Sequence, residues 1–345
     1  MNSNEKPLVN IAKLFFAINI VLLHYGVIDC LPFGSLITAM VTRLAVPYFF
    51  VASGYFWSKK IYASTDRLEQ KAITSTYCKR LGFKLLIFEP ISIVLFLIVS
   101  ILQKAPMRET CISIIQGILF YPSGALWYIQ AVIVAVLLLV PFVSRKRIYF
   151  MVFPAFVLYF IGALGNRYHF LVDNTVVGYL ISRYDDIFVT TRNGLFFGFP
   201  FVFLGCLISR FEERLLQTGR AQAIKIAAAF AFSYLLCFVE YCLVNSRTGR
   251  GDNALYLSYF FVVPLLFILT ARVQKTNRDT ATVRNLSISI YLIHRPINIA
   301  TVYIFKNILQ IHSVAASTGT GILIISLICV LVYKTKKQPF YNWLI

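Results

Sequence analysis

The sequence predicts an all-α polytopic membrane protein with about ten transmembrane helices and with both termini in the cytoplasm. Its 345 residues are 59% hydrophobic, with a mean hydropathy of +0.74. Soluble domains are usually only about 45–50% apolar. Apolar runs of roughly the 17–25 residues that a transmembrane helix needs recur along the chain. Basic residues gather in alternate connecting segments, which is the pattern that membrane topology produces.

The ten predicted spans follow one another in order along the chain. They lie at 8–28, 36–57, 84–103, 125–144, 148–164, 194–209, 222–244, 254–271, 286–306 and 318–333. The sixth, GLFFGFPFVFLGCLIS, holds three glycines and a proline, which predicts a kinked or broken helix. No small-residue cleavage site follows the first span, so we expect it to be retained.

The basic residues predict the orientation. With the N-terminus inside, the cytoplasmic segments and the adjoining span residues hold 22 Lys or Arg, and the outer segments with their adjoining span residues hold 9. Residues 58–84 are then a basic cytoplasmic loop and residues 165–193 an extracytoplasmic loop, within a single domain 1–345. This distribution accounts for the net charge of +19, so the charge gives no reason to expect a nucleic-acid partner.

The seven cysteines are scattered, without a CxxC pair or a Cys/His cluster. Most lie in or beside apolar runs, where cysteine acts as a small hydrophobic residue. We therefore expect no metal site, no disulfide framework and no tightly bound cofactor.

The first apolar run, IAKLFFAINIVLLHYGV, contains two ionisable residues, Lys13 and His24. Ionisable groups inside a membrane span usually have a function. Eleven residues make three turns plus roughly 20°, so the two share one helix face about 16 Å apart. The alternatives are that Lys13 snorkels to the inner interface and that His24 only hydrogen-bonds within the bundle. An imidazole with an ordinary pKa of about 6.5 can take a hydroxyl proton at neutral pH.

Polar groups also lie in the second and fourth predicted spans. In VPYFFVASGYFWSKK, Ser53 and Tyr55 lie near the inner helix end. The small residues there fit close helix packing or a substrate-lining role. In SGALWYIQA, Trp127 opens its span at the outer face. It fits an interfacial aromatic belt or the wall of an acceptor site.

Further candidates lie near the outer face and in the ninth span. Arg192 and Asn193 open the sixth span, and arginine binds carboxylate or phosphate through its planar fork. We expect Glu240 to be the only acid well inside a predicted helix and to pair with Arg192 or His24, because an unpaired buried carboxylate is costly. A purely structural ion pair is the alternative.

The ninth span, SISIYLIHRPI, carries His294 and Arg295 in mid-span. Because Arg295 stays charged, it needs a polar interior or a partner. A phosphate-bearing ligand that enters from the cytoplasm would supply one.

Together these passages resemble the membrane-bound acyltransferase family 3. The resemblance rests on Lys13 and His24, VPYFFVASGYF (46–56), LWYIQA (126–131), RNGLFFGFPFVFLG (192–205) and SISIYLIH (287–294), which follow one another in the family's order. Arg is the commoner residue at the first position, and Lys is a permitted variant. The membrane half of the serine racemases linked to vancomycin resistance, a related group, looks similar. Soluble-enzyme motifs such as GxSxG and HExxH are absent from the sequence.

The resemblance implies a transferase of the bacterial plasma membrane. It would move an acyl group, often acetyl, from cytoplasmic acyl-CoA to a hydroxyl of a cell-envelope glycan. We expect His24 to be the general base or the acyl carrier, with Glu240 as its catalytic partner. The expected donor-binding residues are Lys13, Ser53, Tyr55, His294 and Arg295, and the expected acceptor-binding residues are Arg192, Asn193 and Trp127. The chain stops soon after the tenth span, so we expect it to lack the extracytoplasmic hydrolase-like domain of some members.

A transporter is the rival hypothesis. Mid-membrane charges and broken helices also suit the passage of a small zwitterion such as serine. The two functions differ in their chemistry: a transferase leaves an ester on its product, whereas a transporter needs no acyl donor.

Overall fold

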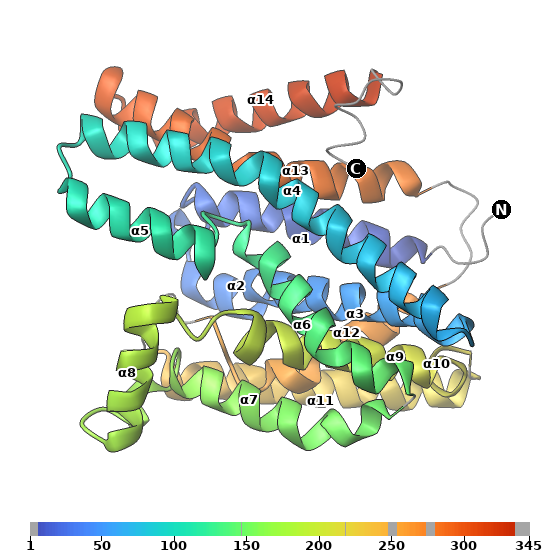
Figure 1. The fold of residues 1–345 in the computed structure, drawn as a ribbon. Coiled ribbons are helices and arrows are strands. Elements are labelled where there is room, and N and C mark those ends of the chain that lie inside the picture. Colours follow the sequence, from blue (N-terminus) through green and yellow to red (C-terminus); the bar gives the residue numbers. More distant parts are fainter. Residues whose placement is uncertain (1–5, 146, 218, 248–253, 274–279, 335–345) are drawn as a thin grey trace. The chain divides into compact units, whose positions relative to one another are not determined.

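The described part of the chain is helical. The computed structural model describes residues 6–145, 147–217, 219–247, 254–273 and 280–334, and within these ranges every regular element is a helix (Figure 1). Among the described residues, seven helices are long and apolar enough to cross a membrane, and three shorter apolar helices accompany them. These observations confirm the all-α, multi-pass membrane class. The terminal segments 1–5 and 335–345 lie outside the described residues, so the cytoplasmic location of the termini stays a prediction.

A helix lies at each predicted span. In chain order these helices are α1 (Pro7–His24), α2 (Gly34–Met40) with α3 (Ala45–Ala63), α4 (Arg67–Leu102), α6 (Trp127–Ser144), α7 (Val152–Leu164), α9 (Phe199–Arg210), α11 (Arg220–Val244), α12 (Tyr259–Ala271), α13 (Ala281–Tyr303) and α14 (Val314–Lys334). The sixth predicted span is irregular as expected, because a π-helical turn, Gly194–Gly198, precedes α9.

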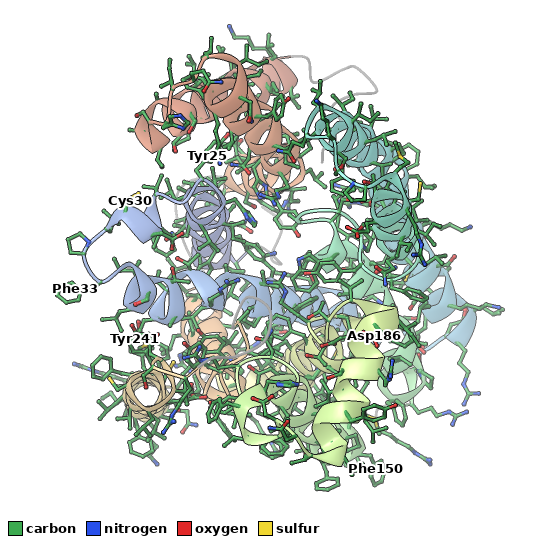
Figure 2. The ribbon with its side chains drawn as sticks, turned by 90° about the vertical axis from the view of Figure 1, so that its left-hand side faces the viewer. Tyr25, Cys30, Phe33, Phe150, Asp186 and Tyr241 are labelled. Atoms are coloured by element: carbon green, nitrogen blue, oxygen red, sulfur yellow. The ribbon has the colours of Figure 1, made fainter. Side chains whose placement is uncertain are left out.

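Apolar side chains face outward from these helices, as they would toward lipid. Ile11 and Phe15 of α1 are 49% and 51% exposed. Phe33, in the turn before α2, is 78% exposed and points away from the protein (Figure 2). A water-soluble surface rarely exposes large contiguous apolar patches, so the outward faces support the membrane assignment.

Helices occupy most of the two predicted loops. Within 58–84, α3 continues to Ala63 and α4 begins at Arg67, so only 64–66 connect them. Hydropathy places the start of the third span at 84 because it responds to charge, whereas helical hydrogen bonding continues through charged residues. At about 1.5 Å per residue, the 36-residue α4 measures about 54 Å, which exceeds the roughly 30 Å hydrocarbon core.

Three further helices lie in connections: α5 (Met107–Leu119), α8 (Val176–Phe188) and α10 (Glu212–Leu216). Segment 165–193 contains α8 and a short 3-10 helix. Thr175 caps α8, because its side-chain oxygen accepts from the backbone N–H of Gly178 at 3.2 Å.

The contacts group the chain into two compact units. The first comprises Met1–Val9, Val46–Gly82 and Tyr128–Thr276; the second comprises Asn10–Ala45, Phe83–Trp127 and Asn277–Ile345. The first unit therefore holds most of α3, the start of α4, and α6 to α12. The second holds most of α1, the rest of α4, α5, α13 and α14.

Two glycines bring α3 and α9 into close contact in the first unit. A Cβ at Gly54 would overlap the carbonyl oxygen of Val202, and a Cβ at Gly205 would lie 2.7 Å from the amide nitrogen of Tyr55. Backbone-to-backbone packing of this kind requires small residues. The small residues of the VASGYF passage are therefore used to pack α3 on α9.

In the second unit α1 and α13 lie side by side and run in the same direction. Near their starts, Asn10 Nδ2 donates to Thr280 Oγ1 at 3.0 Å. Near their ends, the hydroxyls of Tyr25 and Thr301 lie 2.9 Å apart. Figure 2 labels Tyr25 at this end of α1. Parallel packing fits the predicted topology, in which the first and ninth spans both run outward.

Candidate active site

His24 is the last residue of α1, and a glycine determines where that helix ends. Gly26 has φ +73°, a left-handed conformation that glycine adopts without steric cost. The N–H of Gly26 donates to the Leu23 carbonyl at 3.0 Å and that of Val27 to the Leu22 carbonyl at 3.1 Å. This pair of bonds is a Schellman motif. It ends α1 so that the His24 imidazole lies at the helix end, where it is partly exposed.

A second histidine packs beside His24. The rings of His24 and His294 have centroids 5.4 Å apart and planes inclined by 26°. His294 is fully buried in α13. Its Nδ1 lies 2.7 Å from the carbonyl oxygen of Tyr291 and 3.1 Å from that of Ile290. The parallel packing of α1 and α13 therefore brings together two imidazoles that are 270 residues apart in sequence.

Arg295 and Asn298 connect α13 to the end of α1. Arg295 Nη1 donates to Asn298 Oδ1 at 2.8 Å, and Asn298 Nδ2 donates to the His24 carbonyl at 3.1 Å. The last carbonyls of a helix lack intrahelical partners, so Asn298 satisfies one of them. No carboxylate of the described residues pairs with Arg295, and its Nε is buried without a hydrogen-bond partner there. A half-buried guanidinium in this state is suited to an anionic or carbonyl-bearing ligand.

The loop before Trp127 is fixed to both α4 and α13. Both carboxylate oxygens of Glu89 accept from the Ser123 N–H, at 2.9 and 3.0 Å. The Tyr291 hydroxyl donates to the Ala125 carbonyl. Gly124, with φ +64°, lies directly against the side chain of Arg295. The loop is thus held over the arginine by groups from two helices.

Glu89 corrects one sequence expectation. It is 8% exposed within α4, so Glu240 is not the only acid well inside a helix. Glu89 lies inside the predicted span 84–103, five residues after its start. Because α4 begins at Arg67, the helix extends well before Glu89.

Trp127 is buried rather than placed in an exposed aromatic belt. It is 5% exposed and stacks on Tyr121, with ring centroids 5.5 Å apart and planes inclined by 10°. It directly follows the loop that contacts Arg295. Of the three predicted acceptor residues, Trp127 alone belongs to the same unit as His24.

Lys13 lies about two turns into α1, and a second positive charge lies near it. Arg284, on the first turn of α13, lies close enough to Lys13 for their charges to repel each other. We predicted that Arg295 would accompany Lys13, but the structure places Arg295 beside the His24 end and Arg284 beside Lys13. Eleven residues separate Arg284 from Arg295, which is about 16 Å of helix.

Ser53 and Tyr55 lie in the first unit and take part in its packing. Ser53 Oγ lies 2.8 Å from the Tyr128 hydroxyl, which itself donates to the Phe49 carbonyl at 3.0 Å. Tyr55 is fully buried, and its ring centroid lies 5.2 Å from that of Phe267. A donor-binding role for either residue stays a prediction.

Asn193 caps the π-helical turn that opens the sixth predicted span. Its Oδ1 accepts from the N–H groups of Leu195 and Phe196 at 3.0 and 3.2 Å, while its Nδ2 donates to the Tyr184 hydroxyl at 2.7 Å. These hydrogen bonds engage both the oxygen and the nitrogen of the Asn193 side-chain amide. Arg192 precedes the cap in the same unit, and its acceptor-binding role also stays a prediction.

Glu240 joins α11 to the start of α12. Its carboxylate accepts from the Leu257 and Ser258 N–H groups at 2.6 and 2.9 Å, and from the Tyr168 hydroxyl. Arg167 supplies the positive charge nearby. The predicted pairing with Arg192 stays a prediction. Glu240 belongs to the first unit and His24 to the second, so its proposed catalytic partnership with His24 stays a prediction.

Charged side chains gather in two regions of the first unit. A cavity of about 520 Å³ between α4 and α6 is lined by four cations, Arg67, Lys71, Lys79 and Arg145. At α10, Glu212 Oε1 lies 2.9 Å from Lys59 Nζ and 3.4 Å from Lys6 Nζ. Burial raises the pKa of Glu212, but the hydrogen bond and charge of Lys59 and the charge of Lys6 outweigh this, so the pKa lies below its ordinary value.

Sequence patterns could have indicated some of the residues that we did not select. Asn298 follows His294 by four positions and therefore shares its helix face. Gly124 and Gly26 flank the candidate residues in sequence, but their positive φ angles are visible only in the structure. No sequence signal indicates that Glu89 and Ser123 meet, because that contact joins residues 34 positions apart.

Residues 8–334 match the family model for the acyltransferase domain. The chain is 26% identical over 338 residues to a serine/alanine racemase of Enterococcus gallinarum, covering 96% of this chain and 45% of that protein. It is 23% identical over 296 residues to an amino-acid racemase of Enterococcus faecalis, covering 83% of this chain and 40% of that protein.

The chain thus spans less than half the length of these relatives. No solved structure matches it. The family match runs from the start of α1 to the end of α14 and so includes residues of both compact units. This protein belongs to the membrane-bound acyltransferase family 3.

Proposed function

We propose that the protein is a membrane O-acyltransferase that moves an acyl group, acetyl in the simplest case, from cytoplasmic acyl-CoA to a hydroxyl of a cell-envelope glycan. One observation carries the proposal. The parallel pair of α1 and α13 places two cations at one end, Lys13 and Arg284, and two imidazoles at the other, His24 and His294.

This arrangement fits the shape of an acyl-CoA. The molecule has phosphates at one end, a thioester at the other and a long flexible arm between them. The two ends of the α1–α13 pair are about 16 Å apart. Clustered Lys and Arg bind phosphate through charge-assisted hydrogen bonds. With the N-terminus inside, Lys13 and Arg284 face the cytoplasmic donor and His24 faces the outer acceptor.

The cationic cavity between α4 and α6 belongs to the first unit and would bind phosphate by itself. Its four cations come from the predicted cytoplasmic ends of two helices, and three of them belong to the basic segment 58–84. Replacement of Lys71 and Lys79 by alanine is expected to weaken phosphate binding at this cavity.

His24 is the group that we assign to the transfer itself. An imidazole at the end of α1 can take the proton of the acceptor hydroxyl or carry the acyl group. The guanidinium of Arg295, held by Asn298, is placed beside the end of α1 to stabilise negative charge. Trp127 directly follows the loop that contacts Arg295 and would form a wall of the acceptor site.

The test is transfer of radiolabelled acetyl from acetyl-CoA to envelope glycan, using membranes that contain wild type or His24→Ala. Wild type is expected to form a labelled ester that mild alkali releases, and His24→Ala is expected to form none. Wild-type levels of product with His24→Ala would refute the mechanism.

The second candidate is a transporter of a serine-like amino acid, because mid-membrane charges also suit the passage of a small zwitterion. The relatives are named serine/alanine racemase and amino-acid racemase, and this chain matches less than half of each. Such a protein would take up labelled serine without any acyl donor. Serine uptake that depends on His24, with no labelled ester, would support this candidate over the transferase.

A further inference from the structure

The hydrogen bonds of His294 determine which of its ring nitrogens carries the proton. Its Nδ1 lies 2.7 Å from the Tyr291 carbonyl oxygen and 3.1 Å from that of Ile290. A carbonyl oxygen only accepts, so Nδ1 must donate. In the neutral ring the other nitrogen, Nε2, then carries a lone pair and can act as a base.

This lone pair has no partner among the described residues. Nε2 of His294 is buried and makes no hydrogen bond there, and the residue as a whole is fully buried. An unpaired buried acceptor destabilises a fold, whereas an apolar side chain in the same place would not. A buried base that is oriented through its other nitrogen has the geometry of a catalytic imidazole.

The second imidazole lies beside it. His24 stacks against His294 with ring centroids 5.4 Å apart, and Asn298, on the same face of α13 as His294, holds the His24 carbonyl. We propose that His294 Nε2 is the base that takes the proton of the acceptor hydroxyl, and that His24 carries the acyl group. This inference rests on the proposed acyltransferase function.

The chemistry proceeds in two balanced steps. A nitrogen of neutral His24 attacks the thioester carbon, the C–S bond breaks, and the thiolate takes the proton from the other His24 nitrogen. The acceptor hydroxyl then attacks the acyl carbon as its proton passes to His294 Nε2. The C–N bond to His24 breaks, and the proton moves from His294 to the released His24 nitrogen. CoA-SH and the ester are the only products.

The central variant is His294→Asn. An Asn side-chain amide can replace Nδ1–H as donor to the Tyr291 carbonyl, but it supplies no base. His294→Gln is the matched second variant, because it places an uncharged amide near the position of Nε2. His24→Ala is the variant that cannot carry the acyl group.

The experiment incubates each purified protein in lipid nanodiscs with [¹⁴C]acetyl-CoA and glycerol as a simple hydroxyl acceptor. Wild type is expected to form labelled acetyl glycerol. His294→Asn and His294→Gln are expected to slow product formation by about 10²- to 10⁴-fold, the usual range for loss of a general base. They are also expected to retain one hydroxylamine-sensitive acetyl group per protein. The double variant with His24→Ala is expected to retain none.

The other outcomes have distinct meanings. Product formation within about threefold of wild type in both His294 variants would overturn the role of His294 and leave the proposed function intact. If the His294 variants lose acetyl-CoA binding and product formation to the same extent, His294 only supports the donor site, which also overturns the inference. If wild type forms neither product nor acylated protein while it binds no acetyl-CoA, the proposed function fails as well.

Discussion

Replacement of Gly124 by alanine tests the packing of the loop against Arg295 without removing any polar group. Gly124 has φ +64°, and a Cβ there would overlap Arg295 Cγ and lie 3.3 Å from Arg295 Cβ. Carbon atoms pack at about 3.5–4.0 Å, so the Arg295 side chain must shift by about 1 Å. That shift disturbs the hydrogen bond from Arg295 to Asn298. It also disturbs the hydrogen bond that Asn298 donates to the His24 carbonyl.

Two costs add up in Gly124→Ala. A left-handed backbone costs an alanine roughly 1–2 kcal/mol, and overpacking costs roughly 1–3 kcal/mol. We expect a loss of about 2–5 kcal/mol in the free energy of unfolding. We also expect turnover to fall about 100-fold, because a displacement of 1 Å can cost that much.

The assay is denaturant unfolding of the purified protein, combined with acetyl-CoA turnover. Gly319→Ala is the matched control, because Gly319 lies in α14 and a Cβ there would meet no atom within 4 Å. The control is expected to leave stability unchanged or slightly raised. If Gly124→Ala has the same free energy of unfolding and the same acetyl-CoA turnover as Gly319→Ala, the described packing of the loop on Arg295 is wrong.

Three further predictions concern other polar contacts. Glu89→Ala is expected to cost about 1.5–3 kcal/mol in unfolding experiments, because it leaves the Ser123 N–H without its charged acceptor; Glu89→Gln, which keeps one acceptor oxygen, should cost less. Asn193→Ala should cost about 0.5–2 kcal/mol through loss of the helix cap, and an equal loss with Asn193→Asp would contradict this reason. Because the pKa of Glu212 is below its ordinary value, its stabilising contribution is complete above the unfolded-state value and is lost as pH falls through the folded-state value. Thermal unfolding midpoints measured from pH 7 to pH 3 should therefore fall less steeply for Glu212→Gln than for wild type.

Hydropathy was sufficient to predict where the long apolar helices lie, because lipid requires long apolar segments whose backbone bonds are internal. It located the ends of those helices less well. The start of α4 at Arg67 was missed because charged residues lower hydropathy without ending a helix. Amphipathic α8 was missed because a helix that lies in a polar connection has no long apolar run.

The spacing of Lys13 and His24 predicted a two-ended site along one helix. Which cation joins each end depends on the parallel packing of α1 and α13, and that packing is not visible in either segment alone. Arg295 therefore lies beside His24, and Arg284, which we had not selected, lies beside Lys13. The tautomer of His294 likewise follows from the hydrogen bond of its Nδ1 to the Tyr291 carbonyl. The position of that carbonyl is defined only in the folded helix.

The central claim is that the two ends of the α1–α13 pair have different tasks: phosphate binding at Lys13 and acyl chemistry at His24. The measurement is acetyl-CoA binding and turnover by purified protein in lipid, comparing wild type, Lys13→Ala, His24→Ala and the exposed control Lys306→Ala. The account predicts weaker binding with Lys13→Ala, intact binding without turnover with His24→Ala, and wild-type behaviour with Lys306→Ala. Wild-type protein that binds no acyl-CoA, or equal effects of Lys13→Ala and His24→Ala on binding and turnover, would contradict it.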